Sequence, residues 1–178
     1  MDGIKLLQKY LGSETELYQT VFAHSRSVAD KALLLASIHP ELKLDLTFLE
    51  EAALIHDIGV FLTDAPDIFC FGRFPYICHG YLGSEIMVRE GYPKHALVCE
   101  RHTGTGLSLF EIIDKQLPLP HREMKPMSME EQLICFVDKF FSKTNLSQEM
   151  PVPVVRMKLS RYGSEGVARF DSWCDLFL

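Results

Sequence analysis

The apolar residues of this chain recur with the 3.6-residue period of an amphipathic helix along most of its length. The first clear stripe follows Ser13, which is the expected N-cap, and Glu16 three residues later would complete a capping box. The apolar residues of this stripe are Leu17, Val21, Val28, Ala32 and Leu35. A second helix is predicted from about Leu46 to Gly59, where the glycine would end it.

The second half of the chain alternates irregular and helical patterns. Residues 63–83 are rich in aromatic residues, Pro and Gly, and have neither a helical nor a two-residue period, so we expect an irregular lid or loop there. Helices are predicted where the helical pattern returns: over 84–90, from Pro93 to His102, over 107–115, and after a capping box made by Ser128 and Glu131.

The tail after Pro151 has the pattern of one or two further helices, and Trp173, Leu176 and Phe177 are available to dock them on the body. No segment shows strand alternation bounded by turn dipeptides. The chain is therefore predicted to be all-α, a compact helical bundle in a single domain over residues 1–178, with the C-terminal helices of 152–178 docking on it.

Composition narrows the class of protein. With 178 residues, 47% of them hydrophobic, the chain can bury one sizeable core. A net charge of -6 argues against binding a nucleic acid polymer through its phosphates. No apolar run reaches the roughly 18 residues that a membrane span requires, and the first residues lack the apolar region of a secretory signal. We expect a cytoplasmic protein without a membrane partner, and a homodimer is left open.

The five cysteines are odd in number and form no CxxC pair. They lie in or beside apolar stretches, so they are predicted to be buried free thiols in a reducing cytosol rather than a disulfide framework or a zinc knuckle.

Metal-competent side chains lie on or next to the faces that should be buried: His24, His56, Asp57, His102 and Asp138, with His79 joining them from the loop side. Burying such groups unpaired costs several kcal/mol each, and a shared divalent cation removes that cost. Imidazole and carboxylate suit iron, manganese, zinc, nickel or cobalt. A single histidine on an apolar stripe is more often a hydrogen-bonded core residue, but the order and spacing of all six favour a metal site.

His24, the dipeptide His56-Asp57 and the distal Asp138 resemble the H...HD...D signature of the HD-domain superfamily of metal-dependent phosphohydrolases, and "HDIG" is the commonest spelling of its core. The resemblance covers about residues 20–143. His79 in "CHGYLGSE" and His102 in "ERHTGTGLS" match the extra histidines of the two-metal branch of this superfamily.

This resemblance implies an HD-domain helical bundle with two divalent ions. One ion would take His24, His56, Asp57 and Asp138, and the other would take His79 and His102 with Asp57 shared. Asp57 would be the central catalytic residue, and a water molecule between the ions would attack phosphorus. The implied substrate is a small phosphorylated molecule.

One position departs from the pattern. Many relatives carry a basic residue directly after the core motif to contact phosphate, and this chain has Val60. The nearest basic residues in sequence are Arg101, beside His102, and Lys139, beside Asp138, and we predict that they bind the substrate. Each is also explained as a solvated surface charge.

Three functions fit these residues. The first is a metal-dependent phosphohydrolase acting on a small nucleotide or other phosphate ester. The second is a di-iron oxygenase of the HD-domain type, because some two-metal relatives use the same ligands for redox chemistry. The third is a non-catalytic binding module that keeps the fold and has lost turnover.

Overall fold

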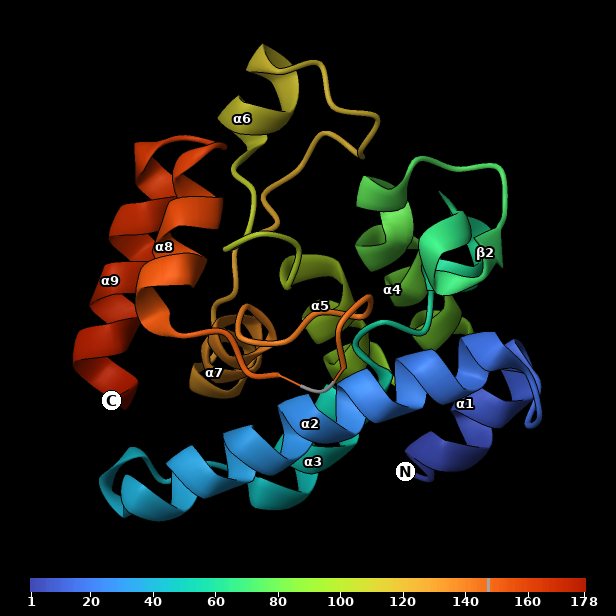
Figure 1. Ribbon diagram of the computed structural model, residues 1–178, viewed down its shortest axis with the longest axis horizontal. Helices are drawn as coiled ribbons and strands as arrows, with labels where there is room; N and C mark the ends of the chain where they lie inside the picture. Colours follow the sequence, from blue (N-terminus) through green and yellow to red (C-terminus); the bar gives the residue numbers. More distant parts are fainter. Residues whose placement is uncertain (147) are drawn as a thin grey trace.

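The computed structural model describes residues 1–146 and 148–178, and its regular structure there is overwhelmingly helical, as the all-α prediction requires (Figure 1). The α-helices are α1 (Gly3–Leu11), α2 (Glu16–Ile38), α3 (Leu46–Ile55), α4 (His79–Arg89), α5 (Pro93–Arg101), α6 (Leu109–Asp114), α7 (Met129–Asp138), α8 (Val152–Ser160) and α9 (Ser164–Phe177). Short 3-10 turns connect several of them, among them η1 (Pro40–Leu42), η2 (Val60–Leu62), η3 (Pro66–Ile68) and η4 (Tyr76–Cys78).

Helix α7 lies at the centre of the body. It contacts α2, α3 and α5, while α2 packs along α3 and α4 along α5. Figure 1 shows α7 nearly end-on, above the α2–α3 pair. Its residues Leu133, Ile134, Phe136 and Val137 are fully buried, because the apolar stripe of this helix is covered on several sides. Asp138, the last residue of α7, is thereby placed among the helices that carry the other candidate ligands.

The C-terminal helices α8 and α9 pack on each other, and α9 packs on α7. Phe136 of α7 lies within aromatic contact of Phe170, Trp173 and Phe177, with ring centroids 5.3 to 6.4 Å apart. The Trp173 indole Nε1–H also donates to Gln132 Oε1 at 3.0 Å. Burial of these three aromatic side chains accounts for the docking of α9, in which Leu176 is only partly buried.

The start of α2 differs from the prediction. The helix begins at Glu16, and its N-cap is Thr15, whose Oγ1 accepts a hydrogen bond from the backbone N–H of Tyr18 at 3.0 Å. Ser13 lies in the preceding turn, so its assignment as the N-cap was wrong. Thr15 Oγ1 also donates to the Leu11 carbonyl at 2.7 Å, which ties the cap to the end of α1, a helix that the sequence pattern did not reveal.

The end of α3 also differs from the prediction, because the helix stops at Ile55 and residues 56–59 form a turn. Gly59 has an ordinary negative φ of -83°, so it is not a left-handed helix stop. A Cβ at this position would instead overlap the His79 carbonyl oxygen and the Gly83 backbone. The glycine therefore permits the close approach of α4 to the turn that carries His56 and Asp57.

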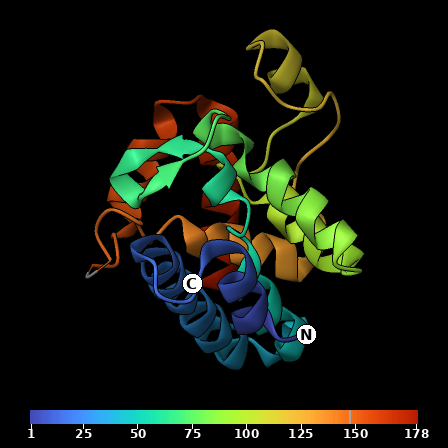
Figure 2. The same cartoon turned by 90° about the vertical axis from the view of Figure 1, so that its right-hand side faces the viewer.

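Residues 63–83, expected to be irregular, contain regular structure. Strands β1 (Asp64–Ala65) and β2 (Cys70–Phe71) pair antiparallel as a two-residue hairpin, visible in Figure 2. Helix α4 begins at His79 rather than at residue 84. His79 is consequently the first residue of a helix that packs along α5, and it does not come from a loop.

Helix α6 and its flanking segments extend away from the rest of the molecule in both ribbon views (Figures 1 and 2). A capping box holds its start, since Ser108 Oγ accepts from the Glu111 N–H and the Glu111 carboxylate accepts from the Ser108 N–H. At α7 only half of the predicted box forms: Ser128 caps the Glu131 N–H, but the Glu131 carboxylate binds the Met127 N–H instead.

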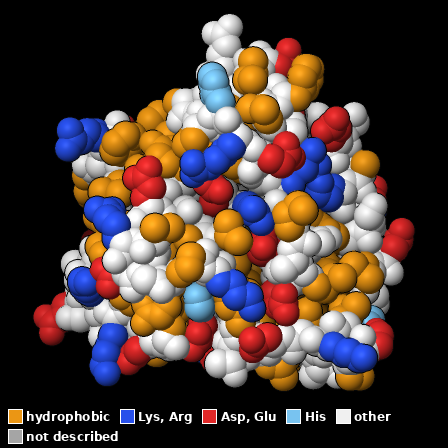
Figure 3. All heavy atoms as spheres, turned by 180° about the vertical axis from the view of Figure 1, so that it is seen from behind, with side chains coloured by type: hydrophobic (Ala, Val, Ile, Leu, Met, Phe, Trp, Pro, Cys, Tyr) orange, Lys and Arg blue, Asp and Glu red, His pale blue; other side chains and the backbone are white. Residues whose placement is uncertain are grey.

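On the face seen in Figure 3, Lys and Arg side chains are interspersed with Asp and Glu among hydrophobic ones. Among the described residues, none of the helices is long and apolar enough to span a membrane. All five cysteines are free, and all but Cys174 are buried, which confirms the prediction of free thiols.

Candidate metal centre

The structure brings the six predicted ligands together in two groups that share Asp57. We call the first the aspartate-rich group; it consists of His24, His56, Asp57 and Asp138. We call the second the histidine pair; it consists of His79 and His102, which face the same Asp57. Within each group the potential ligand atoms lie within 4.8 Å of one another. The six residues come from helices α2, α4 and α7, from the turn after α3 and from the position directly after α5, and all are buried.

In the aspartate-rich group, two imidazoles face two carboxylates. His24 Nε2 lies 2.9 Å from Asp138 Oδ1 and 3.2 Å from Asp57 Oδ2. His56 Nε2 lies 3.0 Å from the same Asp57 Oδ2 and 3.5 Å from Asp138 Oδ1. Two nitrogen and two oxygen atoms thus surround one point, which is a donor set that divalent transition metals accept.

The histidine pair faces the other oxygen of the same carboxylate. His79 Nε2 and His102 Nε2 each lie 3.5 Å from Asp57 Oδ1, and the two nitrogen atoms lie 2.9 Å from each other. Asp57 therefore directs Oδ2 to one group and Oδ1 to the other, as a carboxylate bridging two ions does.

Local backbone geometry sets the orientation of three rings. The Nδ1–H groups of His56, His79 and His102 donate to carbonyl oxygens three residues earlier, at distances of 2.6 to 2.7 Å. His56 and His102 lie directly after the last residues of α3 and α5, where carbonyl groups lack partners within the helix. Because a carbonyl only accepts, each Nδ1 carries a proton and each Nε2 points into the centre, where it can coordinate a metal once it is free of a proton.

The pKa shifts of the histidine residues have opposite directions in the two groups. Burial opposes charge on His56, but Asp57 and Asp138 raise its pKa to about 9. Burial and the proximity of His102 lower the pKa of His79 to about 3, and burial also lowers the pKa of His102. The histidine pair is thus neutral and ready to coordinate at neutral pH, whereas a cation must displace a proton from the aspartate-rich group.

The two carboxyl groups are ionised despite their burial. Burial alone would raise the pKa of Asp57, but His56 and Lys143 hold it well below its usual range. Burial would likewise raise the pKa of Asp138, and Lys139 and His24 hold it low. Ionised carboxylates are the form that binds metals.

The residues present fit a divalent metal. His24 Nδ1, His56 Nε2 and both oxygens of Asp57 are buried without a hydrogen bond of good geometry among the described residues. The two Nε2 lone pairs of His79 and His102 also face each other at hydrogen-bond distance with no proton to share, which is unfavourable unless a cation joins them. A cation in each group would satisfy these atoms except His24 Nδ1, because His24 faces the carboxylates with Nε2.

The predicted substrate-binding residues have different surroundings. Lys139 Nζ donates to Asp138 Oδ2 at 2.6 Å and to the His102 carbonyl at 3.1 Å, so it lies directly at the centre. Arg101 Nη1 donates instead to Glu131 Oε2 of α7 at 2.9 Å. The geometry gives Arg101 a structural partner, and its binding of a substrate stays a prediction.

Sequence reasoning missed Lys143. Its Nζ lies 2.6 Å from Asp57 Oδ2, and only 11% of its side chain is exposed. Burial would lower the pKa of this ammonium group, but Asp57, Tyr76 and Asp138 raise it, so it is charged. Lys143 lies in a turn after the end of α7, where helical periodicity gives no direction for a side chain; its position five residues after Asp138 was the available signal.

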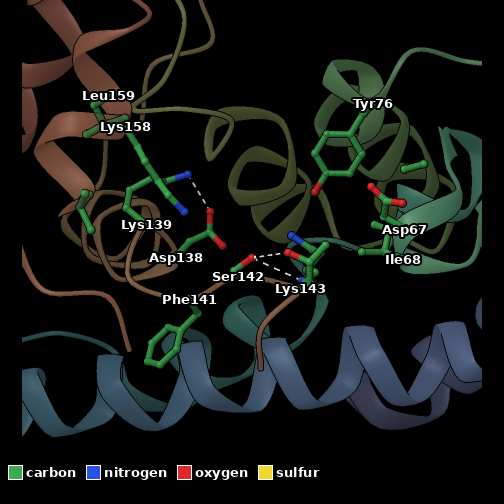
Figure 4. A pocket seen from close by; sticks show the side chains of 13 residues that line it. Asp67, Ile68, Tyr76, Asp138, Lys139, Phe141, Ser142, Lys143, Lys158 and Leu159 are labelled. Carbon is green, nitrogen blue, oxygen red and sulfur yellow. Dashed lines mark hydrogen bonds and ion pairs between the residues drawn. The ribbon is translucent and has the colours of Figure 1, made fainter. Parts of the chain in front are cut away.

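Two cavities reach the centre. One, of about 520 Å³, is lined by His79, His102, the 103–107 loop and apolar side chains that include Ile77, Leu117 and Leu159. The other, of about 410 Å³, lies between the 65–68 segment and α8. Both are lined by Tyr76, Asp138, Lys139 and Lys143, several of which Figure 4 shows directed toward the same space. Each is of a size that small-molecule sites have.

Fold and site together describe an all-α protein with a buried cluster of His and Asp side chains that could hold metal ions. A family model for the HD domain matches residues 21–142. An uncharacterized protein of Methanocaldococcus jannaschii, MJ0778, is 30% identical over 129 residues, which cover 71% of this chain and 69% of that protein. The chain belongs to the HD domain family, which places it in the superfamily of metal-dependent phosphohydrolases.

Two further relatives are longer proteins. A tRNA (cytidine(56)-2'-O)-methyltransferase of Thermoplasma volcanium is 26% identical over 140 residues, and one of Picrophilus torridus is 28% identical over 134 residues. The matches cover 78% and 73% of this chain but only 35% of each methyltransferase. No solved structure matches the chain significantly.

Proposed function

We propose that this chain is a phosphohydrolase that binds two divalent ions and cleaves a small nucleotide or another phosphate ester or anhydride. The observation that carries the proposal is the position of Asp57, which directs one buried oxygen to the aspartate-rich group and the other to the histidine pair. One ion in each group, with Asp57 between them, is the arrangement that suits in-line displacement at phosphorus.

The residues of the chain have separate roles in this proposal. Bound ions would supply positive charge to the phosphoryl oxygens and lower the pKa of an attacking water molecule. The carbonyl groups of Ala53, Tyr76 and Cys99 hold three imidazoles with Nε2 toward the centre. Lys139 would contact the phosphate, and the apolar walls of the larger cavity would exclude water from the part of the substrate next to it.

The methyltransferase names of two relatives do not extend to this proposal, because each match covers only 35% of the relative. A nucleotide is the first substrate to test because of the size of the cavity beside the candidate metal centre. The 520 Å³ cavity is large enough for a ligand of that kind.

The proposal is tested by elemental analysis of anaerobically purified protein, followed by a screen of nucleotides and phosphate monoesters with Mn²⁺, Fe²⁺, Co²⁺ and Ni²⁺. We expect two ions per chain and metal-dependent release of phosphate or of a nucleoside monophosphate, both abolished by chelation. Two bound irons with oxygen consumption and no hydrolysis would point to the oxygenase. Metal binding without either activity would leave a binding module.

A further inference from the structure

Position 60 cannot supply a phosphate contact in this fold. Val60 opens the turn η2, its side chain is fully buried, and it belongs to the main hydrophobic core. Its N–H donates to the Asp57 carbonyl at 3.0 Å, so the backbone there is fixed on the motif. The cation that would meet an anionic substrate must come from another segment.

Lys143 lies in the turn after α7, far along the chain from the core motif His56-Asp57, and its side chain reaches the centre. Its turn is closed by hydrogen bonds between Ser142 and Thr144, and its Nζ lies 6.0 Å from the centroid of the Tyr76 ring as well as 2.6 Å from Asp57. Figure 4 shows Lys143 and Tyr76 across from Lys139 and Asp138 around one space. An anion in that space would lie between the two lysine residues.

The net charge of the centre explains why two lysine residues there would favour binding of an anion. The carboxylates of Asp57 and Asp138 already pair with the ammonium groups of Lys143 and Lys139. Divalent ions would therefore leave the buried centre with excess positive charge, which is costly unless an anion joins it. A phosphate group offsets that charge, and each ammonium group then gains a charge-assisted hydrogen bond.

We propose that Lys143 is a substrate-binding residue, which leaves Asp57 when metal binds and takes the phosphate contact that other chains place directly after the core motif. The assignment rests on the proposed function, because it presumes a phosphate at the metal centre. It adds to the site a residue that the six-residue signature does not include.

The test measures binding of inorganic phosphate to the Mn²⁺-loaded protein by calorimetry, which requires no turnover. Lys143→Met should weaken phosphate binding by at least about tenfold, the loss expected for one charge-assisted hydrogen bond, with unchanged manganese content. Lys31→Met is the matched control, since Lys31 is also a mostly buried lysine paired with a carboxylate, that of Glu149, at 2.7 Å. It should leave phosphate affinity unchanged.

Each other outcome is informative. Unchanged phosphate affinity in Lys143→Met would overturn the assignment and leave the proposed function intact, and so would tighter manganese binding with no change in phosphate affinity, because the lysine would then only compete with the metal. If the wild-type protein with two ions binds no phosphate, the proposed function fails. Should Lys143→Met not fold, Lys143→Gln keeps a polar group of similar length and carries the same expectation.

Discussion

The two halves of the metal centre use the same side-chain chemistry with different charge. The aspartate-rich group has two carboxylates, and Asp57 and Asp138 hold a proton on His56 in the absence of a cation. The histidine pair has no carboxylate of its own and relies on Oδ1 of Asp57. We therefore expect the aspartate-rich group to hold its ion tightly, and the histidine pair to hold a weaker ion that completes the site.

The most damaging change removes the residue that the halves share. Asp57→Ala should lose both ions and lower turnover by about a thousandfold or more, the scale on which loss of one preorganised charge contact affects transition states. Metal content and phosphate release measure the effect. Asp114→Ala, at the end of the outlying α6, is the control. Retention of two ions by Asp57→Ala would show that the halves are independent.

A matched pair of variants separates the halves. Asp138→Ala should weaken the tight ion by more than about a hundredfold, since loss of an outer partner of a ligand alone costs about 10- to 100-fold. His102→Ala should instead leave one ion bound with nearly wild-type affinity and abolish the second. Equilibrium dialysis against Mn²⁺ measures both. Equal losses of manganese affinity in the two variants would contradict the expectation that the aspartate-rich group binds its ion more tightly than the histidine pair.

Metal removal should destabilise the fold. Binding to the native state alone contributes about 4 kcal/mol when free metal is a thousand times the dissociation constant. Chelation should therefore lower the thermal midpoint clearly. In a His79→Ala variant most of this stabilisation should persist, because the tight ion is still present; its complete loss would place the tight ion in the histidine pair.

In the metal-free protein, the two groups should also contribute differently to the pH dependence of folding stability. The pKa of His79 is lowered from 6.5 to about 3, so over that range the unfolded chain binds a proton that the folded chain does not, and stability falls as the pH falls. The pKa of His56 is raised from 6.5 to about 9, so its contribution is complete below 6.5 and is lost as the pH rises to about 9.

Urea unfolding in the presence of a chelator measures both slopes. His79→Gln should flatten the acid side of the stability profile, and His56→Gln should flatten the alkaline side. If both variants change the same side of the pH–stability profile, the two groups do not differ in histidine protonation as we expect.

The sequence predicted which six side chains gather at one place better than it predicted the backbone that positions them. The apolar stripes of α2 and α7 were clear, because burial of one helix face leaves a periodic signal in the sequence. The six-residue signature was sufficient to predict which side chains would lie close together. Ser13 and Gly59 were misassigned, since capping and close backbone approach depend on tertiary neighbours. His79 was placed in a loop because the aromatic segment before it hides the start of α4. Lys143 was missed because a turn has no period.

Anomalous scattering from crystals grown with Mn²⁺ tests the shared role of Asp57 most directly. We expect two peaks, one bounded by His24, His56 and Asp138 and the other by His79 and His102, with one oxygen of the Asp57 carboxylate toward each. A single peak at saturating metal, or a second peak remote from the histidine pair, would contradict it.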